Sequence, residues 1–179
     1  MDLLIESERL LIRRFELRDV PSLIWLSSDP TVAEAASELG TTPDQSAAYI
    51  EEQQALQPFE RDALFDLAIV SRADDAVIGM ITLINRGDHG ELGFALHSDH
   101  RGQGLATEAS AAVIDHAFAA LGMIRIAAEA GVGNAPSRRV LERLGMTHER
   151  TGPGLDGAPA AFYGISKDHW QSPVAKGTG

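Results

Sequence analysis

The sequence contains no cysteine, only two lysines and no long hydrophobic run. Without cysteine, the chain has no disulfide framework and no thiolate zinc site. Its apolar stretches are short and interrupted, so we expect no membrane-spanning helix and no membrane partner. The first residues, "MDLLIESERL", lack the basic start and apolar core of a secretory signal peptide. We therefore expect a cytoplasmic protein.

Basic residues are in the minority, since 15 Lys and Arg stand against 26 Asp and Glu and give a formal net charge of −11. This charge disfavours general binding to nucleic acid. It suits a cationic partner, and it equally suits a protein that is only kept soluble by its charge. With 179 residues, 44% of them hydrophobic, we expect one domain over residues 1–170 and a disordered tail at 171–179.

The hydrophobic pattern predicts strands at 8–15, 64–71, 76–85, 91–97, 124–130, 146–151 and 160–167, and helices at 18–29, 41–56, 105–121 and 134–145. Turn residues between the three central strands favour an antiparallel meander. We expect Asp19 and Asn134 to cap the first and last helices, and Gly145 to end the last one in a left-handed conformation. The fold class is therefore α/β (α+β), a mixed and mostly antiparallel central sheet flanked by helices.

The stretch "DHRGQGLATEAS" (99–110) lies where a strand ends and a helix begins. Gly102 and Gly104 have no side chains, so an anion can approach the unpaired amides of the helix N-terminus. Arg101 would add a fixed positive charge. The loop predicts a phosphate or pyrophosphate cradle, unless it is only a turn. No lysine follows the second glycine as in a Walker A loop, and Thr107 stands where a dinucleotide fingerprint has a small residue.

Four segments, in their order and spacing, resemble one branch of the GNAT acetyltransferases: "ERLLIRRF" (8–15), "ELGFAL" (91–96), "RGQGLATEA" (101–109) and "GNAPSRRVLERLGM" (133–146). That branch contains the RimJ/RimL ribosomal-protein N-terminal acetyltransferases, and the resemblance covers residues 6–170. It implies the GNAT acyl-CoA N-acyltransferase fold, acetyl-CoA as cosubstrate and a primary amine as acceptor. It also implies a homodimer, which is common in this branch.

The resemblance assigns cofactor contacts residue by residue. A bulge near Ala95 and Leu96 would free backbone amides for the pantetheine arm and the thioester carbonyl. Asn134 and Arg138 would face the cofactor, with Arg138 near the 3′-phosphate, unless Asn134 is only a cap and Arg138 is only solvated. The pyrophosphate would lie on the backbone next to Arg101, over Gly102, Gln103, Gly104, Leu105, Ala106 and Thr107.

Two residues are implied in the chemistry. Glu91 matches a GNAT position that often carries the general base, although a carboxylate there could instead pair with an arginine. Ser137 would contact CoA and protonate the departing thiolate, because the helix lacks the tyrosine that many GNAT enzymes use; otherwise it is satisfied locally. Tyr163 is a weaker candidate beside the acceptor cleft and would otherwise pack in the core.

The acceptor stays open between a protein N-terminus and a small-molecule amine. The segments 28–44 and 152–159 are expected to select it, and acidic residues there (Glu34, Glu38 and Asp156) would attract a cation. No metal is expected, because His89 and His97 stand at opposite ends of a strand, roughly 20 Å apart. The alternatives to an enzyme are a non-catalytic acyl-CoA-sensing module of the same fold and an unrelated nucleotide-binding protein.

Overall fold

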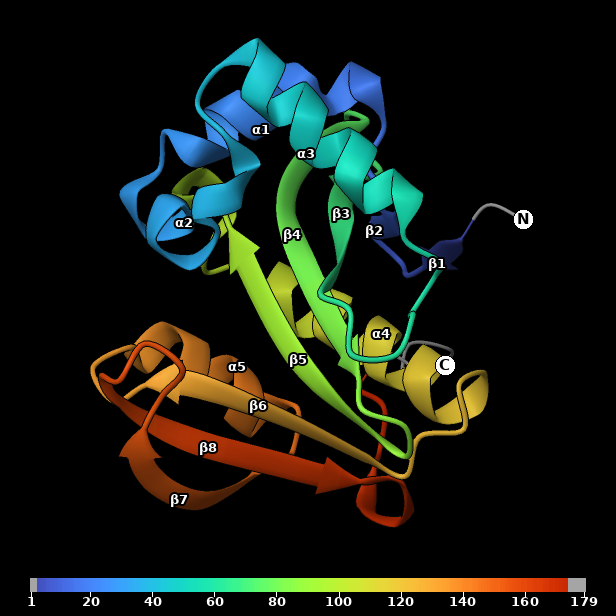
Figure 1. Cartoon of the computed structure of the whole chain (residues 1–179). Helices are drawn as coiled ribbons and strands as arrows, with labels where there is room; N and C mark the ends of the chain where they lie inside the picture. Colours follow the sequence, from blue (N-terminus) through green and yellow to red (C-terminus); the bar gives the residue numbers. More distant parts are fainter. Residues whose placement is uncertain (1–2, 174–179) are drawn as a thin grey trace.

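The computed structural model describes residues 3–173 and is built on one eight-stranded sheet (Figure 1). The strands lie in the order β1-β2-β3-β4-β5-β6-β8-β7. Only β5 and β6 are parallel, and every other neighbouring pair is antiparallel. The bounds are β1 (Leu4–Glu6), β2 (Leu10–Arg13), β3 (Phe65–Ser71), β4 (Ala76–Asn85), β5 (His89–Leu96), β6 (Arg125–Gly131), β7 (Thr147–Pro153) and β8 (Pro159–Ser166). The expected mixed, mostly antiparallel sheet is confirmed.

Helices cover both faces of this sheet. One face carries α1 (Val20–Ser27), α2 (Pro30–Ala35) and α3 (Pro43–Ala55), and the other carries α4 (Leu105–Ala119) and α5 (Ala135–Arg143). Because β3 is covered on both faces, it reads as a nearly continuous apolar run rather than as an alternating one. Four short 3-10 helices, η1 (Leu17–Asp19), η2 (Ser37–Leu39), η3 (Ser98–His100) and η4 (Lys167–His169), complete the chain.

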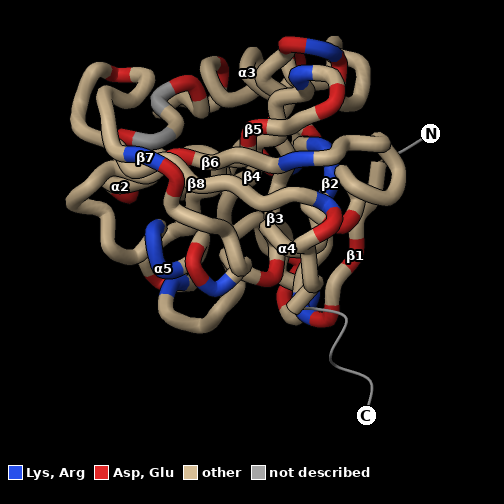
Figure 2. Tube along the Cα trace, turned by 90° about the horizontal axis from the view of Figure 1, so that it is seen from below, with Lys and Arg blue, Asp and Glu red and all other residues tan. Residues whose placement is uncertain are grey.

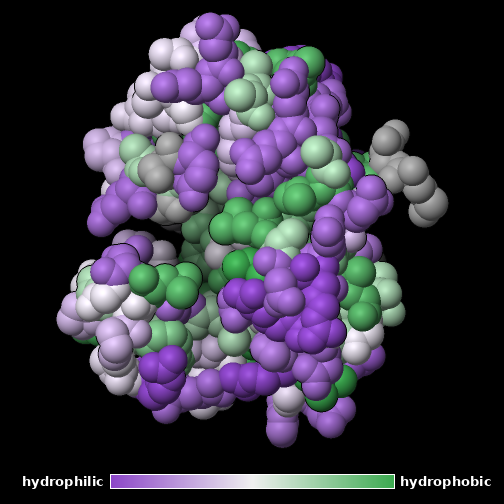
Figure 3. All heavy atoms as spheres, in the orientation of Figure 1, coloured by the Kyte–Doolittle hydropathy of each residue, from purple (hydrophilic) through white to green (hydrophobic). Residues whose placement is uncertain are grey.

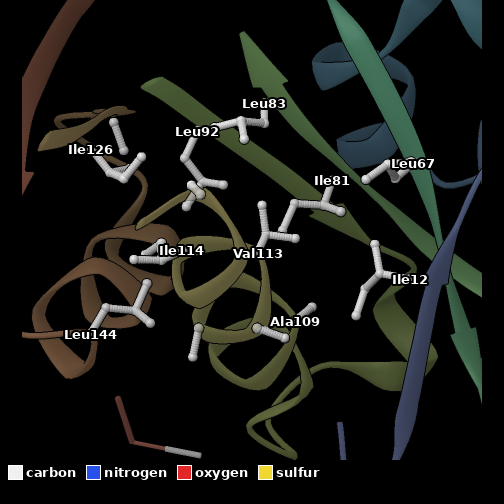
Figure 4. Packing of buried hydrophobic residues seen from close by; sticks show 14 of the residues in the cluster. Ile12, Leu67, Ile81, Leu83, Leu92, Ala109, Val113, Ile114, Ile126 and Leu144 are labelled. Carbon is white, nitrogen blue, oxygen red and sulfur yellow. The ribbon is translucent and has the colours of Figure 1, made fainter. Parts of the chain in front are cut away.

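The larger core lies between α4 and the sheet. Figure 4 shows Val113 and Ala109 of α4 facing Ile81 and Ile12 of the strands, while Ile114 lies toward Leu144. Alanines fill much of the rest of the helix surface, so α4 approaches the sheet closely and is buried on most sides. Each fully buried aliphatic side chain contributes about 1.5–3 kcal/mol relative to exposure. This helix therefore anchors the loop that precedes it.

The expectations about the first forty residues hold in part. The strand expected at 8–15 is present as β2, and the helix expected at 18–29 is divided into η1 and α1. The sequence pattern predicted neither β1, which forms a hairpin with β2, nor α2. Asp19 stands at the start of α1, but its carboxylate makes no cap bond. It is buried and accepts Arg13 Nη1 at 2.7 Å instead, because an ion pair across the β2–η1 corner outweighs the cap. The short α2 is capped by Asp29, which accepts the Thr31 N–H at 2.9 Å.

The ends of α5 are as expected. The Asn134 side chain accepts the Ser137 N–H at 3.1 Å, and Gly145 has a φ of +75°. Residues 171–173 of the expected tail are described, and Ser172 donates to Asp115 of α4 at 2.6 Å. The rest of that tail lies outside the described residues.

Candidate active site

Strands β5 and β6 diverge before they end. Their parallel pairing runs from His89 to Leu92 on β5 and from Arg125 to Ala128 on β6. Beyond Leu92 the two strands separate, as Figure 1 shows, and the space-filling view is hollowed beside them (Figure 3). The carboxyl ends of parallel strands share one edge of the sheet, where ligands of open α/β sheets bind. The N-termini of α4 and α5 both follow at this edge.

The divergence frees particular backbone amides. The His97 N–H donates to the Ile78 carbonyl at 3.1 Å, and the β4–β5 register is unbroken. Because backbone groups alternate in direction along a strand, the amide of Ala95 points toward β4 and those of Phe94 and Leu96 point into the divergence. The β4–β5 pairing shows no bulge at the expected place in β5. A register shift is found instead in the β3–β4 pairing, between Ile69 and Val70. The free amides near the expected position therefore include Leu96 but not Ala95.

The glycine loop has the backbone of an anion cradle. Gly102 and Gly104 have φ values of +74° and +78°, which glycine adopts without strain. The first helical bond of α4 is made by the Glu108 N–H to the Gly104 carbonyl at 3.0 Å. The amides of Leu105, Ala106 and Thr107 therefore have no partner within the helix. The Thr107 hydroxyl is also buried without a hydrogen-bond partner in the described part of the chain.

Arg101 does not offer its charge to this cradle. Its Nε and Nη2 donate to the Leu96 carbonyl at 2.9 and 2.6 Å, and Nη2 also bonds Thr31 Oγ1 and lies 3.5 Å from Asp29 Oδ2. Asp29 is buried and accepts the Ser98 N–H at 2.7 Å. Arg101 therefore links α2 to the start of the glycine loop instead of extending toward a phosphate, because Leu96 and Thr31 hold its guanidinium.

Burial alone would raise the pKa of Asp29. Hydrogen bonds donated by Thr31 and Ser98 outweigh burial and hold that pKa well below its usual range. The carboxylate is therefore charged at neutral pH.

Arg9 is a loop contact that the sequence pattern did not reveal. It stands in the β1–β2 turn, and its Nη1 donates to the Gln103 carbonyl at 3.0 Å. Its Nη2 pairs with Glu108 Oε2 of α4 at 2.6 Å. A Cβ added to Gly104 would lie 3.7 Å from Arg9 Nη2. Arg9 therefore supports the loop from the side away from Arg101.

The two expected residues after Asn134 have different surroundings. Ser137 is half-buried in the first turn of α5, and its N–H completes the Asn134 cap. The side chain of Arg138 is not directed to a phosphate: its Nε donates to the Tyr163 hydroxyl at 3.1 Å and its Nη1 to the Val132 carbonyl at 3.3 Å. Figure 2 shows the basic residues of α5 clustered along that helix.

Tyr163 lies in the core and not beside an acceptor cleft. Its ring is 1% exposed, and its hydroxyl donates to Glu142 Oε1 at 3.4 Å. Together with Arg138, it ties α5 to β8. This outcome is the packing alternative, which periodicity alone did not separate from a site role.

Glu91 forms the arginine pair that was its alternative role. Arg86 Nε and Nη2 donate to its two carboxylate oxygens, each at 3.1 Å, and Arg86 Nη1 also donates to Asp62 Oδ1 at 3.0 Å. Both carboxylate oxygens of Glu91 are therefore engaged by one guanidinium. The structure therefore brings Glu91 to the open face of β5 but occupies it with Arg86.

The histidines have partners other than a metal. Among residues 3–173 there is no group of three or more potential metal-binding side chains. His97 stacks on Trp25, and His89 Nδ1 lies 3.0 Å from Asp88 Oδ1. His116 lies beside Phe59, and burial lowers its pKa.

A hollow beside α3 has two acidic side chains in its lining. Glu38, Gln45, Tyr49 and Glu52 are among the residues that line it. The Tyr49 hydroxyl donates to Asp66 Oδ2 at 2.7 Å. Asp66 is 2% exposed and stands in the middle of the apolar run of β3. A lone acid in such a run was the available signal for this feature, and the sequence pattern did not assign it a role.

A mixed sheet that opens between two parallel strands, with free amides and a helix N-terminus at the opening, is the arrangement that the resemblance to the acyl-CoA N-acyltransferases implies. The chain matches the family model "Acetyltransferase (GNAT) domain" over residues 9–147. It belongs to the GNAT acetyltransferase family, and its class is that of an acyltransferase. An unrelated nucleotide-binding protein is therefore excluded.

Relatives and solved structures agree with this assignment. The N-acetyltransferase YnaD of Bacillus subtilis (strain 168) is 29% identical over 173 residues, which cover 93% of this chain and 98% of the relative. The structure of Mycobacterium smegmatis RimJ in complex with CoA-disulfide superposes with a TM-score of 0.78 and 20% identity, over 97% of this chain and 91% of that one. Ribosomal-protein-S5-alanine acetyltransferase from Vibrio fischeri gives a TM-score of 0.76 and 20% identity, over 95% and 100%. These structural likenesses show the fold.

The family uses acetyl-CoA, and the residues of this chain fit such a group. The two left-handed glycines, the open first turn of α4 and the orphaned Thr107 hydroxyl suit an anionic diphosphate at the loop.

In the described ranges, no helix is long and apolar enough to cross a membrane.

Proposed function

We propose that this chain moves an acetyl group from acetyl-CoA to a primary amine by direct attack within a ternary complex. The observation that carries the proposal is the divergence of β5 and β6, which leaves the amides of Phe94 and Leu96 without a strand partner beside the N-terminus of α4. Catalysis of this kind gains most from holding the amine and the thioester together in a reactive orientation.

The loop residues would hold the donor. Backbone amides from Gly102 to Thr107 would bind the pyrophosphate, and the Thr107 hydroxyl would find its partner there. The pantetheine arm would enter the divergence and take the place of the missing strand neighbour. When bound, acetyl-CoA supplies the activated acetyl group as a thioester. The Phe94 and Leu96 amides would stabilise negative charge that develops on its carbonyl oxygen.

Ser137 is the candidate for protonating the sulfur. It stands in the first turn of α5, at the edge where β5 and β6 end. Its hydroxyl is not needed for the Asn134 cap, which uses the Ser137 N–H. Ser137 is therefore free to act on the departing thiolate without loss of the helix start.

Charge favours a cationic amine as acceptor. The hollow beside α3 carries Glu38 and Glu52 on its wall and the buried Asp66 behind Tyr49. A small-molecule amine and a basic protein N-terminus both satisfy this chemistry. The name of the Vibrio fischeri ribosomal-protein-S5-alanine acetyltransferase indicates a protein substrate for that protein. For this chain the acidic hollow supports a charged acceptor of either kind.

A panel of amines tests the proposal. The purified protein is incubated with acetyl-CoA and one amine at a time, and free thiol is followed. We expect thiol release with amines that carry a second cationic group. Amines of similar size without that second group should give little release. Binding of acetyl-CoA in calorimetry with no release for any amine would instead support the sensing module. If calorimetry detects no binding of acetyl-CoA at millimolar concentration, both the acetyltransferase and the sensing module are contradicted.

A further inference from the structure

The buried Asp66 is connected by hydrogen bonds to three side chains. Tyr49 of α3 donates to its Oδ2 at 2.7 Å, and Thr82 of β4 donates to its Oδ1. The backbone N–H of Asp66 donates to Gln53 Oε1 at 3.0 Å. Tyr49 and Gln53 are also buried, so this cluster is fixed by the packing of α3 on the sheet.

This carboxylate has no compensating cation. Among residues 3–173 no lysine, arginine or histidine pairs with it, and the charged group that acts on it is a further carboxylate, Glu38. Burial raises the pKa of Asp66 to about 6, although the hydroxyls of Thr82 and Tyr49 partly oppose this rise. A group with this pKa is mostly ionised at neutral pH and accepts a proton more readily than an ordinary carboxylate.

Thr82 connects Asp66 to the open part of the sheet. Asp66, Thr82 and Gly93 stand directly opposite one another on β3, β4 and β5, so they share one face of the sheet. A Cβ added to Gly93 would lie 3.7 Å from Thr82 Cβ and 3.9 Å from Thr82 Oγ1, with no other atom within 4 Å. The space over Gly93 is therefore open, and the Thr82 hydroxyl is at its edge.

The same space adjoins the proposed thioester position. Gly93 is the first residue of β5 beyond the paired part of β6, and Phe94 follows it with its amide in the divergence. The opposite face of these strands is covered by α4, as Figure 1 shows. An amine must then approach the thioester from the face that carries Gly93 and Thr82.

We infer that Thr82 and Asp66 form a proton relay for the acceptor amine, an inference that rests on the proposed acetyl transfer. The ammonium group over Gly93 gives one proton to Thr82 Oγ1 while the Thr82 hydroxyl proton moves to Asp66 Oδ1. The amine is then neutral, and Asp66 is a neutral acid that later releases this proton to solvent. The amine nitrogen bonds to the acetyl carbon, and the carbon–sulfur bond breaks. The thiolate takes the Ser137 hydroxyl proton, and the second ammonium proton replaces it on Ser137. Thr82 touches the substrate, and Asp66 is a positioning residue that acts through it.

The first test removes the hydroxyl. In the wild type, the relay makes the ammonium form of the acceptor reactive. The value of kcat/KM for the amine should therefore fall on the acid side, the acid limb of its pH profile, only as Asp66 becomes protonated near pH 6. Without the relay, the enzyme needs amine that is already neutral, and an α-amine has a pKa of about 7.7–8. We expect Thr82→Val to lose about tenfold at pH 7 and to approach the wild type above pH 9. Thr82→Ser should recover most of the lost rate, because it keeps the hydroxyl.

The second test moves the pKa of Asp66 without touching the substrate. Tyr49→Phe removes a hydrogen bond that lowers this pKa, so the acid limb should shift to higher pH. Asp66→Asn should abolish the limb near pH 6. Asp74→Asn, in the exposed β3–β4 turn, is the matched control and should leave the profile as it is. The titration of the Asp66 carboxyl, followed by carbon NMR, measures the same shift independently of activity.

The results separate the two proposals. A wild-type protein that acetylates no amine contradicts the proposed function itself. An active wild type whose profile is unchanged by Thr82→Val, or a Thr82→Ser variant as defective as Thr82→Val, overturns the relay and leaves the acetyl transfer standing. An acid limb that is lost in Glu91→Gln and kept in Asp66→Asn also overturns it, in favour of Glu91.

Discussion

The indole of Trp25 stacks on the imidazole of His97, with ring centroids 3.6 Å apart and an angle of 17° between the planes. Trp25 belongs to α1, and His97 directly follows β5. Together with the bonds from Arg101 to Leu96 and Thr31, this stack attaches the α1–α2 segment to both ends of the turn that precedes the cofactor loop. The segment expected to select the acceptor and the loop expected to hold the donor are therefore one connected structure.

Removing Asp29 should weaken cofactor binding from a distance. Asp29→Ala leaves the Ser98 N–H and the Arg101 guanidinium without their buried acceptor, which costs about 2–3 kcal/mol of stability. The loosened loop should also bind acetyl-CoA about tenfold more weakly, a change of about 1.4 kcal/mol. Urea denaturation and calorimetry measure the two effects. Glu34→Ala, exposed on α2, is the control, and an unchanged acetyl-CoA affinity in Asp29→Ala would contradict the coupling.

Two glycines with the same backbone conformation allow strain to be separated from binding. Gly104→Ala and Gly122→Ala both place a side chain at positive φ, +78° and +70°, and each should cost about 1–2 kcal/mol of stability. Gly122 follows the other end of α4, and a Cβ there would meet no atom within 4 Å. Only Gly104→Ala should weaken acetyl-CoA binding, because its Cβ enters the proposed cradle. Equal affinities of the two variants in calorimetry would remove the loop from the site.

Ser137→Ala should lower kcat more than it raises the KM for acetyl-CoA. Thiolate charge develops only in the transition state, so a lost proton donor removes stabilisation that the bound substrate never had. We expect a drop of about 10²-fold or less, the low end of the range for a general acid, because a thiolate leaves easily. Since the Asn134 cap uses the Ser137 N–H, the thermal midpoint should be kept. A kcat close to that of the wild type would leave Ser137 as a cofactor contact at most.

Asp66 should make the protein less stable as the pH rises through the acid range. Its pKa is raised to about 6 in the folded protein against 3.8 for the ordinary value, so the folded state binds the proton more tightly. The unfolding free energy then falls between about pH 4 and pH 6, by about 3 kcal/mol at most for this group. Asp66→Asn should remove that slope in urea denaturation series. A slope of the same size in the variant would show that another group causes it.

The β7–β8 turn offers a test of the expected homodimer. Leu155 at its tip is 91% exposed and is therefore accessible to a second copy of the chain. If this turn contributes to a dimer, light scattering should give twice the mass of the chain at micromolar concentration. Leu155→Asp should then give a monomer with the same circular dichroism. A wild-type monomer under these conditions would contradict the dimer.

Much of the fold could be predicted because its elements are long and periodic. The strands β3, β4 and β5 are long apolar segments, and the helices α3, α4 and α5 follow a helical period and begin next to a glycine or proline. The short helix α2 escaped because six residues give no period, and only the pair Asp29–Pro30 marked its start. The strand β1 was not predicted because it has three residues and its turn to β2, Ser7 to Arg9, is polar but has no glycine or proline.

The site was predictable where the backbone makes it. Gly102 and Gly104 can be located from the sequence, because positive φ requires glycine. The partners of Arg101 and Arg138 cannot, because each guanidinium is directed by residues from distant segments, Asp29 and Tyr163. Of the two expected free amides, Leu96 points into the divergence and Ala95 points toward β4, because the direction of each amide follows from the tertiary pairing of β4 and β5.

The parting of β5 and β6 gives this sheet an edge in its interior. Most sheets expose unpaired backbone groups only on their outermost strands, where a foreign segment can add to them. Here the unpaired groups of Phe94 and Leu96 lie between two central strands, and the extended pantetheine arm would act as a short inserted strand. A ligand that completes a sheet stabilises the folded form by mass action, by about 2.7 kcal/mol at a hundredfold excess over its Kd. The cosubstrate would then be part of the sheet's hydrogen bonding as well as the source of the acetyl group.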